Sequence, residues 1–344
     1  MKPEKIKVGL VGLGEQSVDN LLPSLFLSSY ANLIAICDIN ENKLNSIGRK
    51  NGIAHSYIDY RSMIDNEGLD AVVVCSFPDV HYEVAKYALE NGLHVFVEKP
   101  PVNNITQLKE LVALASSKSL RAGVGMNFSY TDSNKIIHEI MQSDDFDEPA
   151  FISVEHVSSK PTTVLWNLDS VMDSFLLAQL IHPLDYLLSF GGRYNSIHVY
   201  SSRSHSPLFI QVMIEFENNI IGCLKSGTFY PRFKHTIEII SRAGTTITVK
   251  DLGTIEVTRK DMPVPFDLKS KYCSTVYTPS PLKSGYSKAG YIGELEAFFQ
   301  NILYNRDYRH SFSDLLPVYE ALDKISSALG RHRQNESKLT VYEA

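Results

Sequence analysis

The sequence predicts an α/β domain with a doubly wound parallel sheet, followed by an α+β domain with a mostly antiparallel open sheet packed on helices. In the first 125 residues, short runs rich in Val and Ile alternate with helix-length segments, which is typical of parallel strands buried on both faces. After residue 126, several runs alternate apolar and polar residues, which indicates strands with one face on helices. A chain of 344 residues is long enough for two such domains.

The first domain, residues 1–125, is expected to alternate strands and helices in regular order. Asn91 and Gly92 are typical of a helix end, and Asp79 or Asn104 can cap a helix start. The expected strands are Ile6–Val11, Leu33–Cys37, Ala71–Cys75, His94–Val97 and Ala122–Val124. The expected helices are Ser17–Ser28, Asn42–Asn51, Val80–Asn91 and Ile105–Lys118.

The second domain, residues 126–344, is expected to combine helices with a sheet built from hairpins. Ala243-Gly244 and Asp251-Leu252-Gly253 predict tight turns, and Pro263–Lys288, rich in Pro, Ser and Tyr, predicts a long loop. The expected helices are Asp132–Gln142, Asp173–Phe190, Ile292–Arg306 and Phe312–Gly330, the last two with the option of packing back on the first domain. The expected strands are Ser196–Ser201, Leu208–Phe216, Ile220–Ser226, Thr236–Ser241, Thr245–Lys250 and Thr254–Arg259. The free face of this sheet is expected to mediate a homodimer or homotetramer.

The composition argues against nucleic acid and membrane as partners. The net charge is −6 and the chain has no cluster of Lys and Arg for phosphates. No apolar run approaches the ~18 residues that cross a bilayer, and no signal-peptide core precedes the first strand. The four cysteines form no CxxC pair, so reduced thiols in a cytoplasmic protein are expected.

A glycine-rich turn follows the first expected strand and opens the first expected helix. Gly12 and Gly14, with Leu13 between them, allow a tight turn in which backbone N–H groups approach a pyrophosphate. The third position of this pattern is Ser17, which is small enough to let the helix pack on the sheet. The context predicts a Rossmann domain for NAD(H) or NADP(H). The alternative is a purely structural turn.

Asp38 ends the second expected strand and bears on the choice of cofactor. Its carboxylate can accept both hydroxyls of an adenosine ribose and would repel a 2′-phosphate. No Arg follows it directly, so NAD(H) is favoured over NADP(H). The alternative is an Asp that caps the next helix.

Two further segments follow strands, where ligands of open α/β sheets bind. One runs from Cys75 to His81 and the other contains Glu98-Lys99-Pro100. Together with the glycine-rich turn and His182-Pro183-Leu184-Asp185, they resemble the glucose–fructose oxidoreductase, inositol dehydrogenase and rhizopine-catabolism (Gfo/Idh/MocA) family. The resemblance spans nearly the whole chain and implies an NAD(P)-dependent oxidoreductase for a hydroxyl or keto group of a sugar, cyclitol or sugar nucleotide.

The resemblance also implies roles for individual residues. Lys99 matches the family lysine near nicotinamide C4, and His182 matches a histidine that relays a proton or binds substrate. Asp185 can orient that histidine or be structural, and Asn127 and Tyr130 are further substrate-binding candidates. A metal held by His182 and Asp185 alone would lack two ligands, so no metal is expected. The cofactor-binding candidates are Gly12, Leu13, Gly14, Asp38, Ser76, Phe77, Pro78, His81, Glu98 and Lys99.

The sequence departs from the family pattern on the substrate side. Ala178 stands where sugar dehydrogenases of the family commonly carry Asp, and Phe77 stands in the usual Thr position. The segment from Met126 to Tyr130 lacks the Arg often found there. Asp173, Tyr130, Tyr186 or His156 are possible replacements. A ligand-sensing regulatory protein of the same fold is therefore the alternative function.

Overall fold

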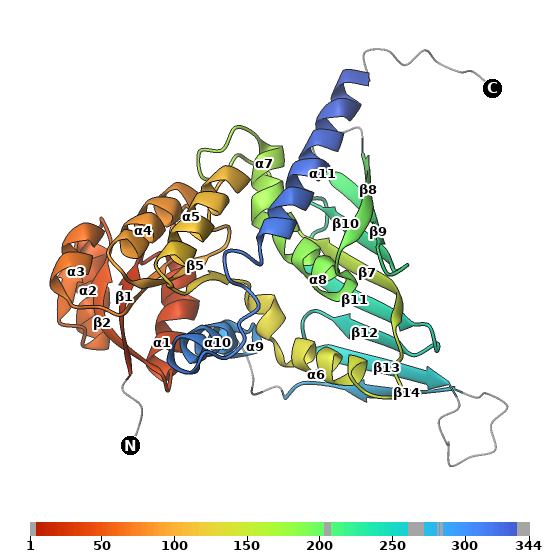
Figure 1. Cartoon of the computed structure of the whole chain (residues 1–344), viewed down its shortest axis with the longest axis horizontal. Coiled ribbons are helices and arrows are strands. Elements are labelled where there is room, and N and C mark those ends of the chain that lie inside the picture. The colour runs from red at the N-terminus through yellow and green to blue at the C-terminus, as the bar shows by residue number, and fades with distance from the viewer. Residues whose placement is uncertain (1–4, 203–207, 261–271, 281, 283–284, 336–344) are drawn as a thin grey trace. The chain divides into compact units, whose positions relative to one another are not determined.

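The computed structural model describes residues 5–202, 208–260, 272–280, 282 and 285–335. The chain divides into two compact units (Figure 1). The first combines Met1–Asp132 with Pro281–Leu316, and the second combines Ser133–Ser280 with Pro317–Ala344.

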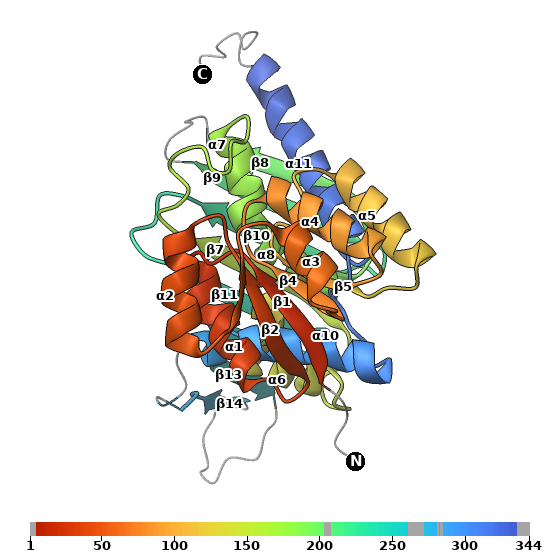
Figure 2. The ribbon, with the colours of Figure 1, turned by 90° about the vertical axis from the view of Figure 1, so that its left-hand side faces the viewer.

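The first unit contains a six-stranded sheet in the order β3-β2-β1-β4-β5-β6, with all neighbouring strands parallel (Figure 2). The prediction of a doubly wound parallel sheet is confirmed, and the strand order reverses between β1 and β4. The strands are β1 (Ile6–Val11), β2 (Ala31–Cys37), β3 (His55–Tyr57), β4 (Ala71–Val74), β5 (His94–Glu98) and β6 (Ala122–Gly125). The connecting helices are η1 (Ser17–Leu21), α1 (Leu22–Leu27), α2 (Glu41–Asn51), α3 (Tyr60–Asn66), α4 (Pro78–Glu90) and α5 (Ile105–Ser117).

Some details of the first unit differ from the expectation. The strand β3 and the helix α3 were not predicted, because His55–Tyr57 is short and lacks an apolar run. Asn104 caps α5 by accepting a hydrogen bond from the Gln107 N–H at 3.0 Å. Asp79 caps no helix, since α4 begins one residue earlier, and its Oδ1 accepts a hydrogen bond from Asn103 Nδ2 instead.

A later helix, α10 (Tyr291–Tyr304), completes the core of the first unit. Leu295, Phe298 and Phe299 are fully buried on it, and the Phe298 ring lies 5.5 Å from the ring of Phe96 on β5. Gly290 precedes α10 with a φ of +94°, and a Cβ there would lie 2.0 Å from the Asn127 carbonyl oxygen. The helix is thus fixed against η2 (Asn127–Tyr130), just after β6.

The second unit contains an eight-stranded sheet in the order β14-β13-β12-β11-β7-β10-β9-β8. Among the described strands of this sheet, β7 and β10 are the only pair that runs parallel, so the prediction of a mostly antiparallel sheet is confirmed. Both predicted hairpin turns are present, between β11 and β12 and between β12 and β13. The strands are β7 (Pro149–Val157), β8 (Tyr194–Ser201), β9 (Phe209–Phe216), β10 (Ile221–Gly227), β11 (Lys234–Ser241), β12 (Thr246–Lys250), β13 (Thr254–Lys260) and β14 (Tyr272–Tyr277).

Two strands of this sheet were missing from the prediction. The strand β7 lies at the centre of the sheet, and its alternation of Ile152, Val154 and His156 with polar residues is a signal that could have identified it. The prediction of a loop over Pro263–Lys288 is wrong in part, because β14 and the short helix α9 (Gly285–Lys288) lie within it. Residues 261–271 are outside the described residues.

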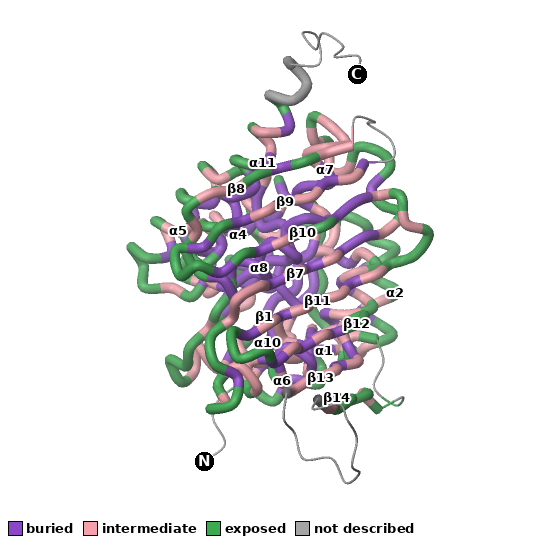
Figure 3. Tube along the Cα trace, turned by 90° about the vertical axis from the view of Figure 1, so that its right-hand side faces the viewer, coloured by how far each residue is buried: buried purple, intermediate pink, exposed green. Residues whose placement is uncertain are grey.

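Helices cover one face of this sheet. The helix α8 packs on β7 and β10, where the Phe216 ring fills the space left by two glycines. A Cβ on Gly191 or Gly222 would lie 2.3 or 2.7 Å from that ring. Along the strands, buried residues alternate with partly exposed ones (Figure 3). The helices are α6 (Asp132–Met141), α7 (Val171–Phe175), η3 (Leu176–Leu180), α8 (Ile181–Gly191) and α11 (Leu316–Asn335). No helix within the described ranges is long and apolar enough to span a membrane.

Candidate active site

The glycine-rich turn is held between the ends of β2 and β4. The Gly12 N–H donates to the Cys37 carbonyl oxygen at 2.8 Å, and a Cβ on Gly12, whose φ is +91°, would lie 2.0 Å from the Cys75 carbonyl oxygen. Only glycine fits this position. Around Gly14, by contrast, no described atom from beyond the adjoining backbone lies within 4 Å of where a Cβ would be. The turn therefore leaves open space beside a helix N-terminus, as a bound pyrophosphate requires.

Asp38 lies beside this turn. Its Oδ2 accepts a hydrogen bond from the Leu13 N–H at 2.7 Å, and its Oδ1 accepts one from the Asn40 N–H at 2.8 Å. The cap of α2 is Asn40, which accepts from the Lys43 N–H, so the alternative of Asp38 as the helix cap is wrong. Each carboxylate oxygen retains acceptor capacity, because it has a second lone pair.

His81 joins the turns that follow β4 and β5. The Ser76 N–H donates to its Nε2 at 2.7 Å, and its Nδ1 lies 2.8 Å from the Pro100 carbonyl oxygen. Nδ1 must therefore carry the proton. Burial lowers the pKa of His81 to about 4, which keeps the ring neutral. His81 thus positions the two turns, while Phe77, at the start of α4, is 58% exposed.

Glu98 and Lys99 follow at the carboxyl end of β5. Glu98 is buried, and its Oε2 accepts a hydrogen bond from the backbone N–H of Lys99 at 3.2 Å. Burial raises the pKa of Glu98 to about 7 and lowers the pKa of Lys99, while each charge opposes the shift of the other group. A lowered pKa makes the Lys99 ammonium group a better proton donor than an exposed lysine. Burial also raises the pKa of the neighbouring Cys75 thiol, which argues against a nucleophilic role.

Asn127 and Tyr130 lie on η2, directly after β6. Asn127 is buried, and its Nδ2 donates to the Ala289 carbonyl oxygen at 2.9 Å. The hydroxyl of Tyr130 is 3.0 Å from His310 Nδ1, and its ring stacks on Tyr308 at 6.3 Å. Both side chains therefore have partners within the first unit.

In the second unit, His182 and Asp185 lie on α8 and are 5% and 6% exposed. Their spacing of three residues places them on the same side of the helix. Ala178 lies one turn earlier, in η3. Asp173, one of the suggested replacements, accepts a hydrogen bond from the Ser170 hydroxyl at the start of α7, at 2.5 Å.

A pair of buried histidines lies on the eight-stranded sheet of the second unit. His156 on β7 and His235 on β11 approach at 3.0 Å between their Nδ1 atoms, so one donates and the other accepts. The ring of Tyr186 on α8 lies 5.5 Å from His235. His235 was not identified from the sequence, since a single histidine in a strand carries no signal. Burial lowers the pKa of His235 to about 4.

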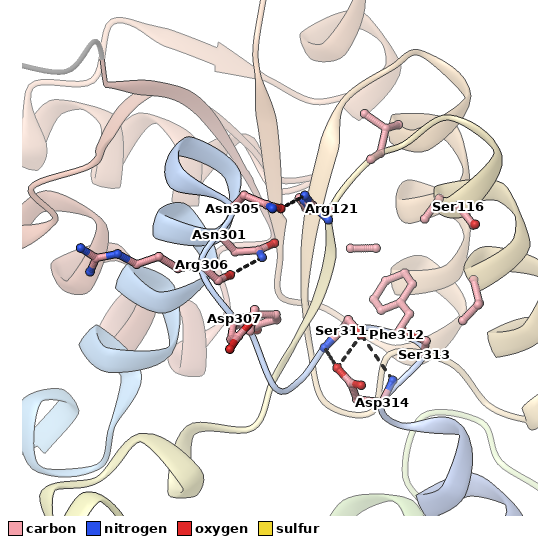
Figure 4. A pocket seen from close by; sticks show the side chains of 15 residues that line it. Ser116, Arg121, Asn301, Asn305, Arg306, Asp307, Ser311, Phe312, Ser313 and Asp314 are labelled. Carbon is pink, nitrogen blue, oxygen red and sulfur yellow. Dashed lines mark hydrogen bonds between the residues drawn. The ribbon is translucent and has the colours of Figure 1, made fainter.

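A cavity of about 490 Å³ lies elsewhere, near the start of β6 (Figure 4). Two pairs of its polar side chains bond to each other: Arg121 to Asn305, and the Ser311 hydroxyl to Asp314 at 2.5 Å. It lies at the opposite end of β6 from the glycine-rich edge and is separate from the candidate site. Among the described residues, no group of three His, Cys, Asp or Glu is placed to hold a metal ion.

Comparison with known proteins agrees with this geometry. Residues 6–126 match the model of the oxidoreductase family with an NAD-binding Rossmann fold. A dehydrogenase structure from Chromobacterium violaceum is 32% identical, with a TM-score of 0.93 over 98% of this chain and all of that one. The chain belongs to the Gfo/Idh/MocA oxidoreductase family.

More distant relatives of this Gfo/Idh/MocA protein include named dehydrogenases. Myo-inositol 2-dehydrogenase of Thermotoga maritima is 24% identical over 180 residues, which are 52% of this chain and 53% of that protein. A levoglucosan dehydrogenase solved with NADH and levoglucosan is 18% identical, has a TM-score of 0.81, and covers 95% of this chain and 98% of that one, which shows a common fold. This member of the family is thus an oxidoreductase of the dehydrogenase class with an NAD-binding Rossmann fold. The open space at Gly14 and the Asp38 carboxylate beside the turn fit such a cofactor.

Proposed function

We propose that this protein transfers a hydride between NAD(H) and the hydroxyl or keto carbon of a sugar, cyclitol or sugar-nucleotide-like molecule. The observation that supports this most is the position of Lys99, a partly buried cation that follows β5 at the same edge of the sheet as the glycine-rich turn. The names of the inositol and levoglucosan dehydrogenases support a substrate with several hydroxyl groups.

In this proposal Lys99 acts on the substrate oxygen. Its ammonium group donates a hydrogen bond to the hydroxyl or carbonyl oxygen and stabilises the negative charge that develops there. The nicotinamide supplies the hydride chemistry when it is bound. The turn of Gly12, Leu13 and Gly14 holds the pyrophosphate: the Gly12 and Leu13 N–H groups bond to Cys37 and Asp38 and fix the turn, and the Gly14 N–H is proposed to donate to the pyrophosphate.

Four further residues are proposed to act on the substrate or position a group that does. His182 relays the proton of the reacting hydroxyl and Asp185 orients its imidazole, while Asn127 and Tyr130 of the first unit contact the substrate. The remaining cofactor contacts are proposed for residues after β4 and β5, namely Ser76, Phe77, Pro78, His81, Glu98 and Lys99. His81 acts there by fixing the two turns.

A regulatory protein that binds cofactor and ligand without turnover is the second candidate. Ala178, in place of the acidic residue of sugar dehydrogenases, favours it. Lys99 and His182 favour the enzyme.

We also propose a cytoplasmic location, which the four free cysteines favour.

We expect NAD(H) to bind more tightly than NADP(H), because the Asp38 carboxylate accepts ribose hydroxyls and repels a 2′-phosphate. The repulsion between close like charges is worth about 1–3 kcal/mol, so Asp38→Ser should narrow the preference by about tenfold. Calorimetric titration of both cofactors into both proteins measures this. Equal affinity of the wild type for the two cofactors would contradict the assignment.

We expect Lys99→Met to lower turnover by at least ~10²-fold, because it removes the charge and the three donors while keeping an unbranched side chain. Affinity for NAD(H) should change little, since the turn and Asp38 hold the other end of the cofactor. Steady-state assays of NADH absorbance with a panel of sugars check this. An equally active variant would exclude Lys99 from catalysis, and a wild type without turnover would favour the regulatory protein.

We expect His182→Asn to lower turnover by ~10²–10⁴-fold, the usual contribution of general acid–base catalysis. Cofactor affinity should stay the same, because this residue belongs to the second unit. Activity is compared per folded molecule, with the folded fraction measured by circular dichroism. If the variant loses thermal stability but its folded fraction keeps full activity, His182 is a core residue only.

We propose that the outer face of the eight-stranded sheet forms a homodimer or homotetramer. Tyr200 and Ile221 lie on this face and are 62% and 39% exposed. Ile221→Lys should shift the protein toward the 38.6 kDa monomer in light scattering, because a charge opposes burial there. Ile39→Lys, at a 91% exposed site of the first unit, is the control. A monomeric wild type at micromolar concentration would refute the proposal.

A further inference from the structure

Glu294 on α10 is a buried carboxyl group that the proposed reaction does not use. It is fully buried, and neither of its carboxylate oxygens has a hydrogen-bond partner among the described residues. Glu98 Oε1 is likewise buried without a described partner. A buried ionised carboxylate without hydrogen-bond donors is strongly unfavourable. At least one of these two carboxyl groups is therefore expected to be protonated.

The contact between α10 and β5 brings the two carboxyl groups into the same buried region. Phe96 and Phe298 are in contact, with their rings 5.5 Å apart. Glu98 lies two residues beyond Phe96, on the same face of the strand, and Glu294 lies one helical turn before Phe298. Glu98 lies nearer than Phe96 to the carboxyl edge of the sheet, because it ends β5. Glu294 lies nearer than Phe298 to the same edge, because the start of α10 lies against η2, which follows β6. The charge of Glu98 accordingly raises the pKa of Glu294 further, in addition to burial.

The other titratable groups around the pair come from every neighbouring element. Tyr291 lies on α10 and accepts a hydrogen bond from Gln16 Nε2 at 2.6 Å, and Tyr308 follows the same helix and donates to the Val124 carbonyl oxygen at 3.2 Å. Cys75 ends β4, and Lys99 follows Glu98. Burial raises the pKa of the thiol and of both phenols, so they are neutral at physiological pH. Among the described groups that act on the pair, Lys99 therefore supplies the positive charge.

We propose that Glu98 and Glu294 hold one proton between them, with Glu294 as the protonated donor and Glu98 as the carboxylate that stabilises the charge of Lys99. Two carboxyl groups packed together in a dry site cannot both ionise. In this arrangement the Glu294 O–H donates to Glu98 Oε1, and Glu98 Oε2 accepts from the backbone N–H of Lys99. Glu294 is then a positioning residue, because it acts on the proposed reaction through Glu98 and Lys99.

A neutral amide and an apolar side chain at position 294 should behave differently. Glu294→Gln keeps an N–H donor for Glu98, so the pH dependence of turnover should match the wild type. Glu294→Met removes the donor, and Glu98 then takes up the proton. Lys99 then loses its counter-charge, and the pKa of Lys99 falls. In the plot of turnover against pH, the limb that reflects the titration of Lys99 should therefore move by about one pH unit toward acid pH. This readout rests on the proposed function.

A second readout is independent of turnover. Infrared spectra of the protein without nucleotide should contain a protonated-carboxyl band at neutral pH in the wild type, which Glu294→Gln removes. Glu296→Gln is the matched control, because Glu296 lies on the same helix but accepts from the Ser28 hydroxyl at 2.6 Å. It should leave the band unchanged.

The outcomes distinguish the shared proton and the positioning role of Glu294 from the proposed function. A wild type without the band, or a band that survives Glu294→Gln, would overturn the shared proton. Identical pH profiles for Glu294→Gln and Glu294→Met would overturn the positioning role. If the wild type turns over no sugar-like substrate, the proposed function fails, and the infrared comparison still decides the state of the pair.

Discussion

The carboxyl edge of the first unit depends on the contact between the glycine-rich turn and the end of β4. Gly12 approaches the Cys75 carbonyl oxygen so closely that any side chain would collide with backbone, which cannot yield as a flexible side chain can. This contact fixes the Leu13 N–H toward Asp38 and leaves the space beside Gly14 open. The features that suit a dinucleotide are thus consequences of one backbone approach.

The neighbouring turns are tied to this edge by a neutral histidine. His81 receives a hydrogen bond from the turn after β4 and donates one to Pro100 after β5. Both ring nitrogens bond to the backbone, so the imidazole holds the turn after β4 at a fixed position relative to the turn after β5. Its burial keeps it uncharged, and the position of Lys99 does not depend on a titration of His81.

Burial also decides the electrostatics next to Lys99. The helix α10, which follows β5 by almost 200 residues in the sequence, contacts this strand through Phe298 and Phe96 and adds a second buried carboxyl group, Glu294. In a low dielectric, the cost of desolvating two carboxylates exceeds their attraction to the single cation, Lys99. The protonation of Glu98, Glu294 and Lys99 is therefore coupled. The family match at residues 6–126 does not include this helix.

The sequence by itself determined the glycine-rich turn, the parallel and antiparallel sheets, and the family, because periodicity and short motifs are local in the chain. It also indicated Asp38, Lys99 and His182 as candidates. Only the tertiary structure revealed that His81 holds two turns together and that Glu294 and Glu98 are both buried with unpartnered carboxyl oxygens, since no sequence spacing relates these residues. The strand β3 escaped prediction because its three residues take their conformation from pairing with β2. Local patterns identify elements and motifs, whereas the partners and protonation of buried groups depend on which distant segments exclude water from them.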